Sequence, residues 1–181
     1  MTEFIAPARL APNPEANLES PPSIKLTVVR LPYAGGDEIG ELLCQIGDAE
    51  PIPHGLFPRH FYFMRSLVEA AIEDERSGKS FRRGLRPRSY LADRYAEMRG
   101  THVEVGVMGN YAKEMRDLIG AFLPRAFRAA GRDVPARLPN PIRTVRGAGY
   151  QLSEAITWAF VDDGASPSRR TQPFDVPPPP A

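Results

Sequence analysis

The sequence predicts a small α+β domain: an antiparallel sheet, then three helices, then a β-hairpin. Two patterns of apolar residues predict this class. Near both ends of the expected domain, apolar and polar residues alternate as in strands, and between these segments apolar residues recur every three or four positions as in helices. The chain has 181 residues, of which 20 are prolines, a length that suits one domain with flanking segments. We expect the domain to span residues 23–162, between a disordered arm at 1–22 and a disordered proline-rich tail at 163–181.

Three strands are expected first, in a small antiparallel sheet. Residues 24–31 combine β-branched side chains with alternating polarity, and residues 42–46 form a second apolar run. The glycine pair at 35–36 favours a turn between them. Residues 52–56 would add a strand at the edge of this sheet, because the two prolines at 51 and 53 cannot donate backbone hydrogen bonds.

Three helices are expected next. The first begins at Pro58, a residue favoured in the first turn of a helix, and runs to about residue 73. The second spans about 89–98 with Ser89 as its N-cap, and the third starts near Asn110 and should end or bend at Pro124. The apolar side chains expected to face the core are Phe61, Met64, Leu67, Val68, Ala71 and Ile72 in the first helix, Leu91, Tyr95 and Met98 in the second, and Tyr111, Met115, Leu118 and Phe122 in the third.

A β-hairpin is expected after the helices. Residues 142–145 and 150–152 are two short strand-like runs, joined by Arg146 and the segment Gly147-Ala148-Gly149. Glycines accommodate the tight turn and leave the arginine at its tip. A further strand at about 155–160 is expected to extend this second sheet.

The charge of the chain is segregated, although its formal total is only +1. Residues 76–146 contain sixteen Lys or Arg against six Asp or Glu. A local excess of this size creates a positive field that attracts polyanions, and arginine suits bidentate contact with phosphate. The densest run of basic residues contains no acid and comprises Arg76, Lys79, Arg82, Arg83, Arg86 and Arg88. For this run taken alone, a solvated basic loop is the alternative interpretation.

Several classes of function are not expected. One cysteine, Cys44, and three histidines at no metal-binding spacing give no basis for an internal disulfide, a metal centre or another cofactor, and a lone cysteine suits a reducing cytoplasm. Because no apolar run approaches the roughly 18 residues of a membrane helix, no membrane partner is expected. The sequence has no nucleophile–base pair, paired carboxylate motif or phosphate-binding glycine loop, so we expect no enzyme.

Residues 142–152 read I-R-T-V-R-G-A-G-Y-Q-L. They resemble the wing of the DNA-binding effector domain of OmpR/PhoB-type response regulators, whose pattern is I-R-T-V-R-G-x-G-Y-x-L. The expected element order is also similar, over about 24–152. The resemblance implies a winged helix-turn-helix that binds double-stranded DNA and regulates transcription, with the third helix in the major groove. It also implies a homodimer on DNA, with a monomer off DNA as the alternative for a domain without its receiver. We expect no receiver domain, because 23 residues precede the first expected strand.

The resemblance also assigns roles to individual residues. Arg146 would enter the minor groove, Arg143 and Thr144 would lie on the DNA backbone, and Tyr150 would pack the wing onto the domain. In the major groove an asparagine can pair adenine and an arginine can pair guanine, although either side chain could instead face solvent. The remaining candidates are Asn110, Lys113, Arg116 and Glu114 of the third helix for base or phosphate contacts, and Arg82, Arg83, Arg86 and Arg88 for phosphate contacts.

Two departures keep other interpretations open. Where the family has a basic stretch in the third helix, this chain has Ile119 and Ala121, so a protein-interaction adaptor that has lost specific DNA binding is the alternative function. The segment 100–109 corresponds to the part of the family that can contact RNA polymerase, and it offers His102 and Glu104 for such a contact. A plain connecting loop is the alternative for that segment.

Overall fold

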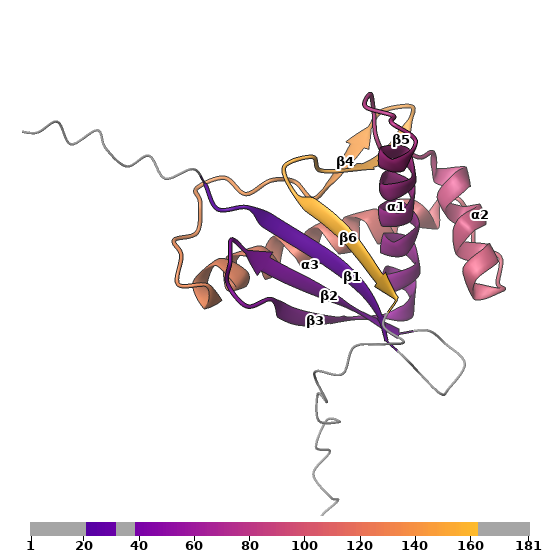
Figure 1. Ribbon diagram of the computed structural model, residues 1–181. Helices are drawn as coiled ribbons and strands as arrows, with labels where there is room; N and C mark the ends of the chain where they lie inside the picture. The colour runs from indigo at the N-terminus through magenta and orange to yellow at the C-terminus, as the bar shows by residue number, and fades with distance from the viewer. Residues whose placement is uncertain (1–20, 32–38, 163–181) are drawn as a thin grey trace, which may run out of the picture.

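Four strands form the first sheet of the computed structural model, which describes residues 21–31 and 39–162: β1 (Ile24–Leu31), β2 (Ile39–Ile46), β3 (Ile52–Leu56) and β6 (Thr157–Asp162). Their order is β3-β2-β1-β6 (Figure 1). The pairs β1–β2 and β2–β3 are antiparallel, whereas β6 runs parallel to β1 with Lys25 opposite Thr157. The expected edge position of β3 is confirmed, and the sheet is mixed rather than purely antiparallel.

The sheet expected for the strand at 155–160 is wrong. The strand forms as β6, but it joins β1 instead of the hairpin. The pairing of the hairpin ends at Ser153, whose N–H donates to the carbonyl of Pro141 at 2.9 Å. The chain then turns towards β1, and Trp158 Nε1 donates to the carbonyl of Ser153 at 3.1 Å. In this register Trp158 and Phe160 lie opposite Leu26 and Val28 and are half-buried beside the core.

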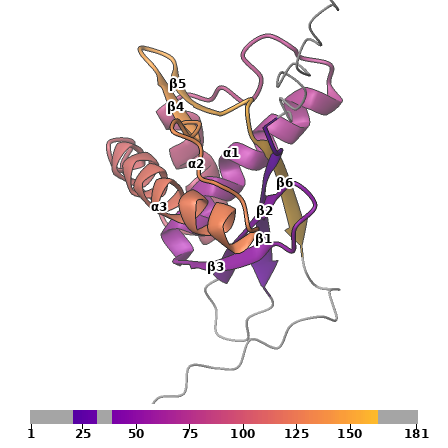
Figure 2. The same cartoon turned by 90° about the vertical axis from the view of Figure 1, so that its left-hand side faces the viewer.

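Three helices lie on one side of this sheet: α1 (Pro58–Arg76), α2 (Arg88–Arg99) and α3 (Val107–Ala129). α1 and α3 pack against the sheet, and α2 packs against both of these helices (Figures 1 and 2). The start of α1 at Pro58 is confirmed. The expected N-cap of α2 is wrong, because Pro87 occupies that position and Ser89 is already the second helical residue.

The expected stop of α3 at Pro124 is also wrong. The helix continues to Ala129 with this proline inside it. Proline removes one backbone hydrogen bond and costs a helix interior about 3 kcal/mol. The turns that follow bury Ala126 and Phe127, and this burial outweighs the local cost of the proline.

The second sheet is a two-stranded antiparallel hairpin, β4 (Ile142–Val145) and β5 (Gly149–Leu152), as expected from the sequence. It lies beside α3, on the side of the molecule away from the four-stranded sheet (Figure 2). The backbone of Arg86, between α1 and α2, adds a β-bridge to Tyr150 of β5. This bridge occupies the outer edge of β5, where a further strand had been expected.

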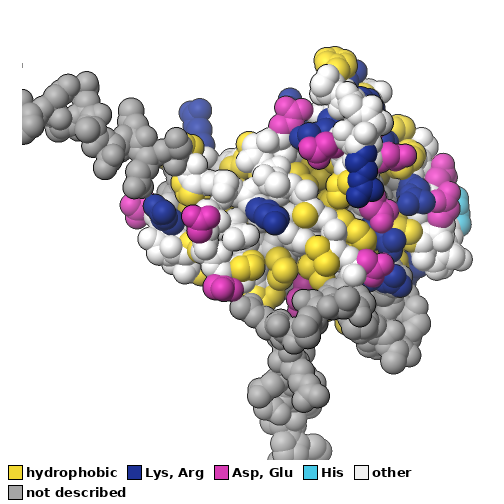
Figure 3. Space-filling view, in the orientation of Figure 1, with side chains coloured by type: hydrophobic (Ala, Val, Ile, Leu, Met, Phe, Trp, Pro, Cys, Tyr) yellow, Lys and Arg dark blue, Asp and Glu magenta, His cyan; other side chains and the backbone are white. Residues whose placement is uncertain are grey.

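One hydrophobic core lies between the sheet and the helices. Most side chains expected to face it are buried, and the others are half-buried at its edge: Ala71, Ile72, Met98, Tyr111 and Leu118. The buried stripe of α3 is rotated from the expected one. It consists of Met108, Ala112, Met115, Ile119, Phe122, Leu123, Ala126 and Phe127. On the other side of the sheet, hydrophobic side chains gather over the strands in the view of Figure 3.

Some expectations concern residues that the structure does not describe. The arm up to residue 20, the turn at 35–36 and the tail at 163–181 lie outside the described residues. The division of the chain into one domain and two flanks therefore stays a prediction. In the described part of the chain, none of the helices combines the length and the apolar character that crossing a membrane requires.

Candidate functional site

A groove of about 600 Å³ opens between the β4–β5 hairpin and the start of α2. Its walls come from residues 87–89, Val105 and 144–149. The two cations at this groove, Arg88 and Arg146, are exposed. No described side chain caps the start of α2, so the positive end of the helix dipole adds to their field. The groove therefore attracts anionic groups.

The hairpin turn presents Arg146 to solvent. The next residue, Gly147, has a φ of +74°, which glycine adopts without strain. Arg143 and Thr144 lie on opposite faces of β4, because side chains alternate along a strand. Arg116 of α3 donates hydrogen bonds to Thr144 Oγ1 at 2.8 Å and to the carbonyl of Ile142 at 3.4 Å. Arg116 and Thr144 therefore fix the hairpin to α3.

α3 presents a polar face on the side away from the core. Asn110, Lys113 and Asp117 are exposed there, and residues three or four apart on a helix are neighbours. Ile119 is fully buried, so at this position the missing cation is explained by packing against the core. The face begins next to the groove, because a Cβ at Gly109 would lie 3.4 Å from Tyr150 Oη and 3.9 Å from the guanidinium carbon of Arg88.

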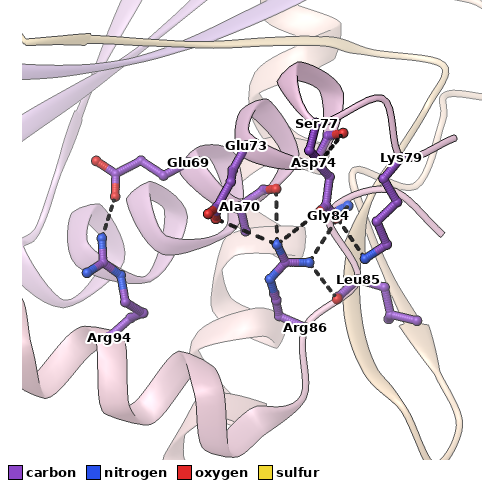
Figure 4. Close-up of polar contacts among 10 residues, drawn as sticks. All are labelled: Glu69, Ala70, Glu73, Asp74, Ser77, Lys79, Gly84, Leu85, Arg86 and Arg94. Atoms are coloured by element: carbon purple, nitrogen blue, oxygen red, sulfur yellow. Dashed lines mark hydrogen bonds and ion pairs between the residues drawn. The ribbon is translucent and has the colours of Figure 1, made fainter. Parts of the chain in front are cut away.

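Arg86 is held inside the molecule by Asp74, in the last turns of α1 (Figure 4). Its Nη1 lies 2.9 Å from Oδ2 of Asp74 and its Nη2 lies 2.8 Å from Oδ1, and the two side chains are 13% and 8% exposed. The same carboxylate accepts hydrogen bonds from the backbone N–H of Gly84 at 2.7 Å and from Lys79 Nζ at 3.1 Å.

This network shifts the pKa of both partners. The Arg86 guanidinium, and after it the Gly84 N–H and Lys79, hold the pKa of the Asp74 carboxyl well below its usual range. The bonds to Asp74 also raise the pKa of Arg86. Because the backbone of Arg86 bridges Tyr150 through two hydrogen bonds of 3.0 Å, the same network positions the hairpin.

The other arginines of the basic run have different surroundings. Arg83 Nη1 lies 3.4 Å from a carboxylate oxygen of Glu75, and the carbonyl of Arg83 accepts a hydrogen bond from Gln151. Arg82 is exposed, with its guanidinium 5.1 Å from the ring centre of its neighbour Phe81. Arg88 lies over the ring of Tyr150 at 5.4 Å, at the edge of the groove. The structure thus separates four arginines that the sequence had grouped.

Glu114 of α3 binds α1. Its Oε2 lies 2.6 Å from His60 Nε2 and 3.1 Å from Arg59 Nε. The hydrogen bond from His60, followed by that from Arg59, lowers the pKa of Glu114. This pair of contacts fixes α3 against the first turn of α1. Glu114 is therefore engaged within the protein, although the sequence had made it a candidate for contacts outside it.

Asp74 and the partners of Glu114 were missed by sequence reasoning. A signal for Asp74 was present, because three consecutive acids at 73–75 directly precede the basic run. Opposite charges that adjoin in sequence can pair when the chain folds back on itself. No comparable signal exists for Glu114 and His60, which are 54 residues apart.

Comparison with known proteins adds no relative: no family model matches the chain, and neither a curated protein nor a solved structure matches it. The function is therefore inferred from the geometry, the charge and the sequence pattern of this chain's own residues.

Proposed function

We propose that this protein binds double-stranded DNA with sequence preference, as a winged helix that regulates transcription. In this proposal α3 enters the major groove, the β4–β5 hairpin is the wing, and Arg146 enters the adjacent minor groove. The observation that carries it is the set of exposed cations around the groove and α3. Within the described residues, no acid forms an ion pair with Arg88, Lys113, Arg143 or Arg146.

Four other cations of the basic segment are paired with acids of the protein itself. Lys79, Arg83, Arg86 and Arg94 all form ion pairs, the last with Glu69 and Glu97. Over α1 and α2, the face drawn in Figure 3 carries interleaved acidic and basic side chains. Unpaired cations gain the most binding free energy from a phosphate, because they do not have to break an internal ion pair to contact it. Among the described residues, the cations without an internal ion pair therefore lie mostly on the hairpin, the groove and α3.

The shapes of these elements also suit DNA. An α-helix fits the major groove, and α3 has an exposed polar face of the kind that can reach base edges. A thin turn that carries one arginine between flexible neighbours can enter a narrow A·T-rich minor groove, whose negative potential attracts the guanidinium. The similarity of residues 142–152 to an OmpR/PhoB-type wing supports the same assignment.

We expect Arg146→Ala to remove an A·T preference and to weaken binding to the best duplex by about 1–3 kcal/mol. The test is a selection of duplexes from a random pool at about physiological salt, with binding constants measured on the best sequences. Lys25→Ala is the matched control, because Lys25 is an exposed cation of β1 in the four-stranded sheet. If no duplex is enriched, or if both variants bind alike, the proposal is wrong and a protein partner becomes the better hypothesis.

Arg88→Ala is expected to weaken binding by a similar factor on all duplexes. A phosphate contact carries no sequence information, so the selected motif should not change. The slope of log K against log salt concentration should fall in magnitude by about 1. Arg137→Ala, which removes an exposed arginine near residues 21–24, should leave that slope unchanged. An unaltered slope in Arg88→Ala would exclude this residue from the DNA contact.

A further inference from the structure

Asp117 lies in the middle of the exposed face of α3. Lys113 is four residues before it and Ala121 four residues after it, so both are its neighbours on the helix surface. The Asp117 side chain is exposed and forms no ion pair or hydrogen bond with any residue that the structure describes. An uncompensated carboxylate therefore occupies the surface on which the proposed function places DNA.

The other acid of α3, Glu114, differs from Asp117 because it has partners within the protein. The Glu114 carboxylate is compensated by His60 and Arg59 and is directed at α1. Asp117 has no such partner within the described residues. A carboxylate near a phosphate is repelled, with an energy that grows as water is excluded. On a DNA-binding face this cost is offset only where the carboxylate accepts hydrogen bonds from the nucleic acid.

The donors of the major groove are few. Cytosine offers its N4 amine and adenine its N6 amine, while guanine and thymine offer acceptors on that edge. Beside the adenine amine lies N7, an acceptor that would repel the second oxygen of a carboxylate. Cytosine has a C–H group in the corresponding place. A lone aspartate therefore favours cytosine over the other three bases.

The surface around Asp117 allows a short side chain to reach a base. Gly120 and Ala121, on the next turn, are exposed and carry no side chain longer than a methyl group. A Cβ built at Gly120 meets no described atom within 4 Å. The helix backbone can therefore approach the floor of the DNA major groove closely on this side. An aspartate requires this close approach because its carboxylate is bonded directly to Cβ.

We propose that Asp117 is a specificity-determining residue that accepts a hydrogen bond from the N4 amine of a cytosine in the major groove. The inference rests on the proposed function and adds one base pair to the expected recognition sequence. It also predicts an asymmetric result. Removing the carboxylate weakens binding at a C·G pair but strengthens binding to unrelated duplexes, because one repulsive charge is lost.

The test uses the full chain and its variants Asp117→Asn, Asp117→Ala and Asp48→Asn. Asp48, an exposed residue of the turn between β2 and β3, provides the same change of charge away from α3. Each protein is used to select duplexes from a random pool, and affinities are then measured on the best duplex and on copies changed at one base pair. We expect a cytosine position for the parent and for Asp48→Asn, with a loss of about 5- to 150-fold when that cytosine is replaced.

The two Asp117 variants should respond differently. Asp117→Ala should lose the preference at that position, whereas Asp117→Asn should change it to adenine, which an asparagine can pair through N6 and N7. A residue with a purely structural role would not change the preferred base. An unchanged motif in both variants overturns the assignment of Asp117 alone. If the parent enriches no sequence, the proposed function fails together with this inference.

Discussion

Removing the carboxylate of Asp74, in the variant Asp74→Ala, is expected to lower the free energy of unfolding by about 3–5 kcal/mol. Asp74 is the acceptor for Arg86, Lys79 and the Gly84 N–H, and its side chain is only 8% exposed. Without it, the guanidinium of Arg86, which is 13% exposed in the parent, keeps only the more distant carboxylate of Glu73 at 3.9 Å and two backbone carbonyls. Urea unfolding followed by circular dichroism measures this loss.

Glu75→Ala is the matched control, because it removes the next acid along the same helix. The Glu75 side chain is 67% exposed and lies 3.4 Å from Arg83. Exposed ion pairs contribute less than about 1 kcal/mol. Equal losses in the two variants would show that the buried network does not hold the end of α1 to the following loop.

The pH dependence of stability provides an independent test of the same carboxylate. Unfolded aspartate titrates near pH 3.9, and the folded-state pKa of Asp74 lies well below that value. Its contribution is therefore complete above about pH 5 and is lost as the pH falls towards the folded-state pKa. The stability difference between the parent and Asp74→Asn should shrink between about pH 5 and pH 3. The lowered pKa of Glu114 acts in the same direction, but it is common to both proteins and cancels.

The arginines of the basic run have different surroundings in the structure, and this difference shows what charge patterning can and cannot predict. The run itself and its positive field are visible in the sequence. The sequence does not show that the loop after α1 folds back, which places Arg86 on Asp74 and leaves Arg88 at the groove. Ion pairing depends on the three-dimensional path of the chain. Arg86 and Arg88, two residues apart, therefore have different surroundings. Arg86 therefore supports the hairpin, and the proposed phosphate contact is retained for Arg88.

The elements with strong local signals were the ones that sequence could predict. Alternation and helical spacing located the strands and helices, and a turn-rich motif located the hairpin. The parallel pairing of β6 with β1 joins residues about 130 apart, as in Leu26 and Trp158, and no local pattern encodes that partner. The continuation of α3 past Pro124 has a similar cause, because burial of later residues outweighs a local breaker.

Gly149→Ala is expected to detach the hairpin from the loop that carries Arg86. A Cβ at this position would overlap the carbonyl oxygen of Arg86 and lie 2.8 Å from Pro87 Cα. The φ of Gly149 is +129°, which other residues rarely adopt. Backbone strain and the loss of both bridge hydrogen bonds to Tyr150 should together cost about 2–6 kcal/mol. Amide hydrogen exchange at residues 142–152 and unfolding in urea measure the effect.

Gly147→Ala is the control that distinguishes the effect of the steric clash with Arg86 from the effect of backbone strain. Gly147 also has a positive φ, +74°, but a Cβ there meets no described atom within 4 Å. Its substitution should cost only the strain of a left-handed residue, about 1–2 kcal/mol, and leave the bridge to Arg86 intact. If the protein binds DNA as proposed, binding to the selected duplex should therefore fall much further in Gly149→Ala, because the position of Arg146 depends on a hairpin held to the domain. Equal hydrogen exchange and equal binding in the two variants would show that Arg146 acts without that support.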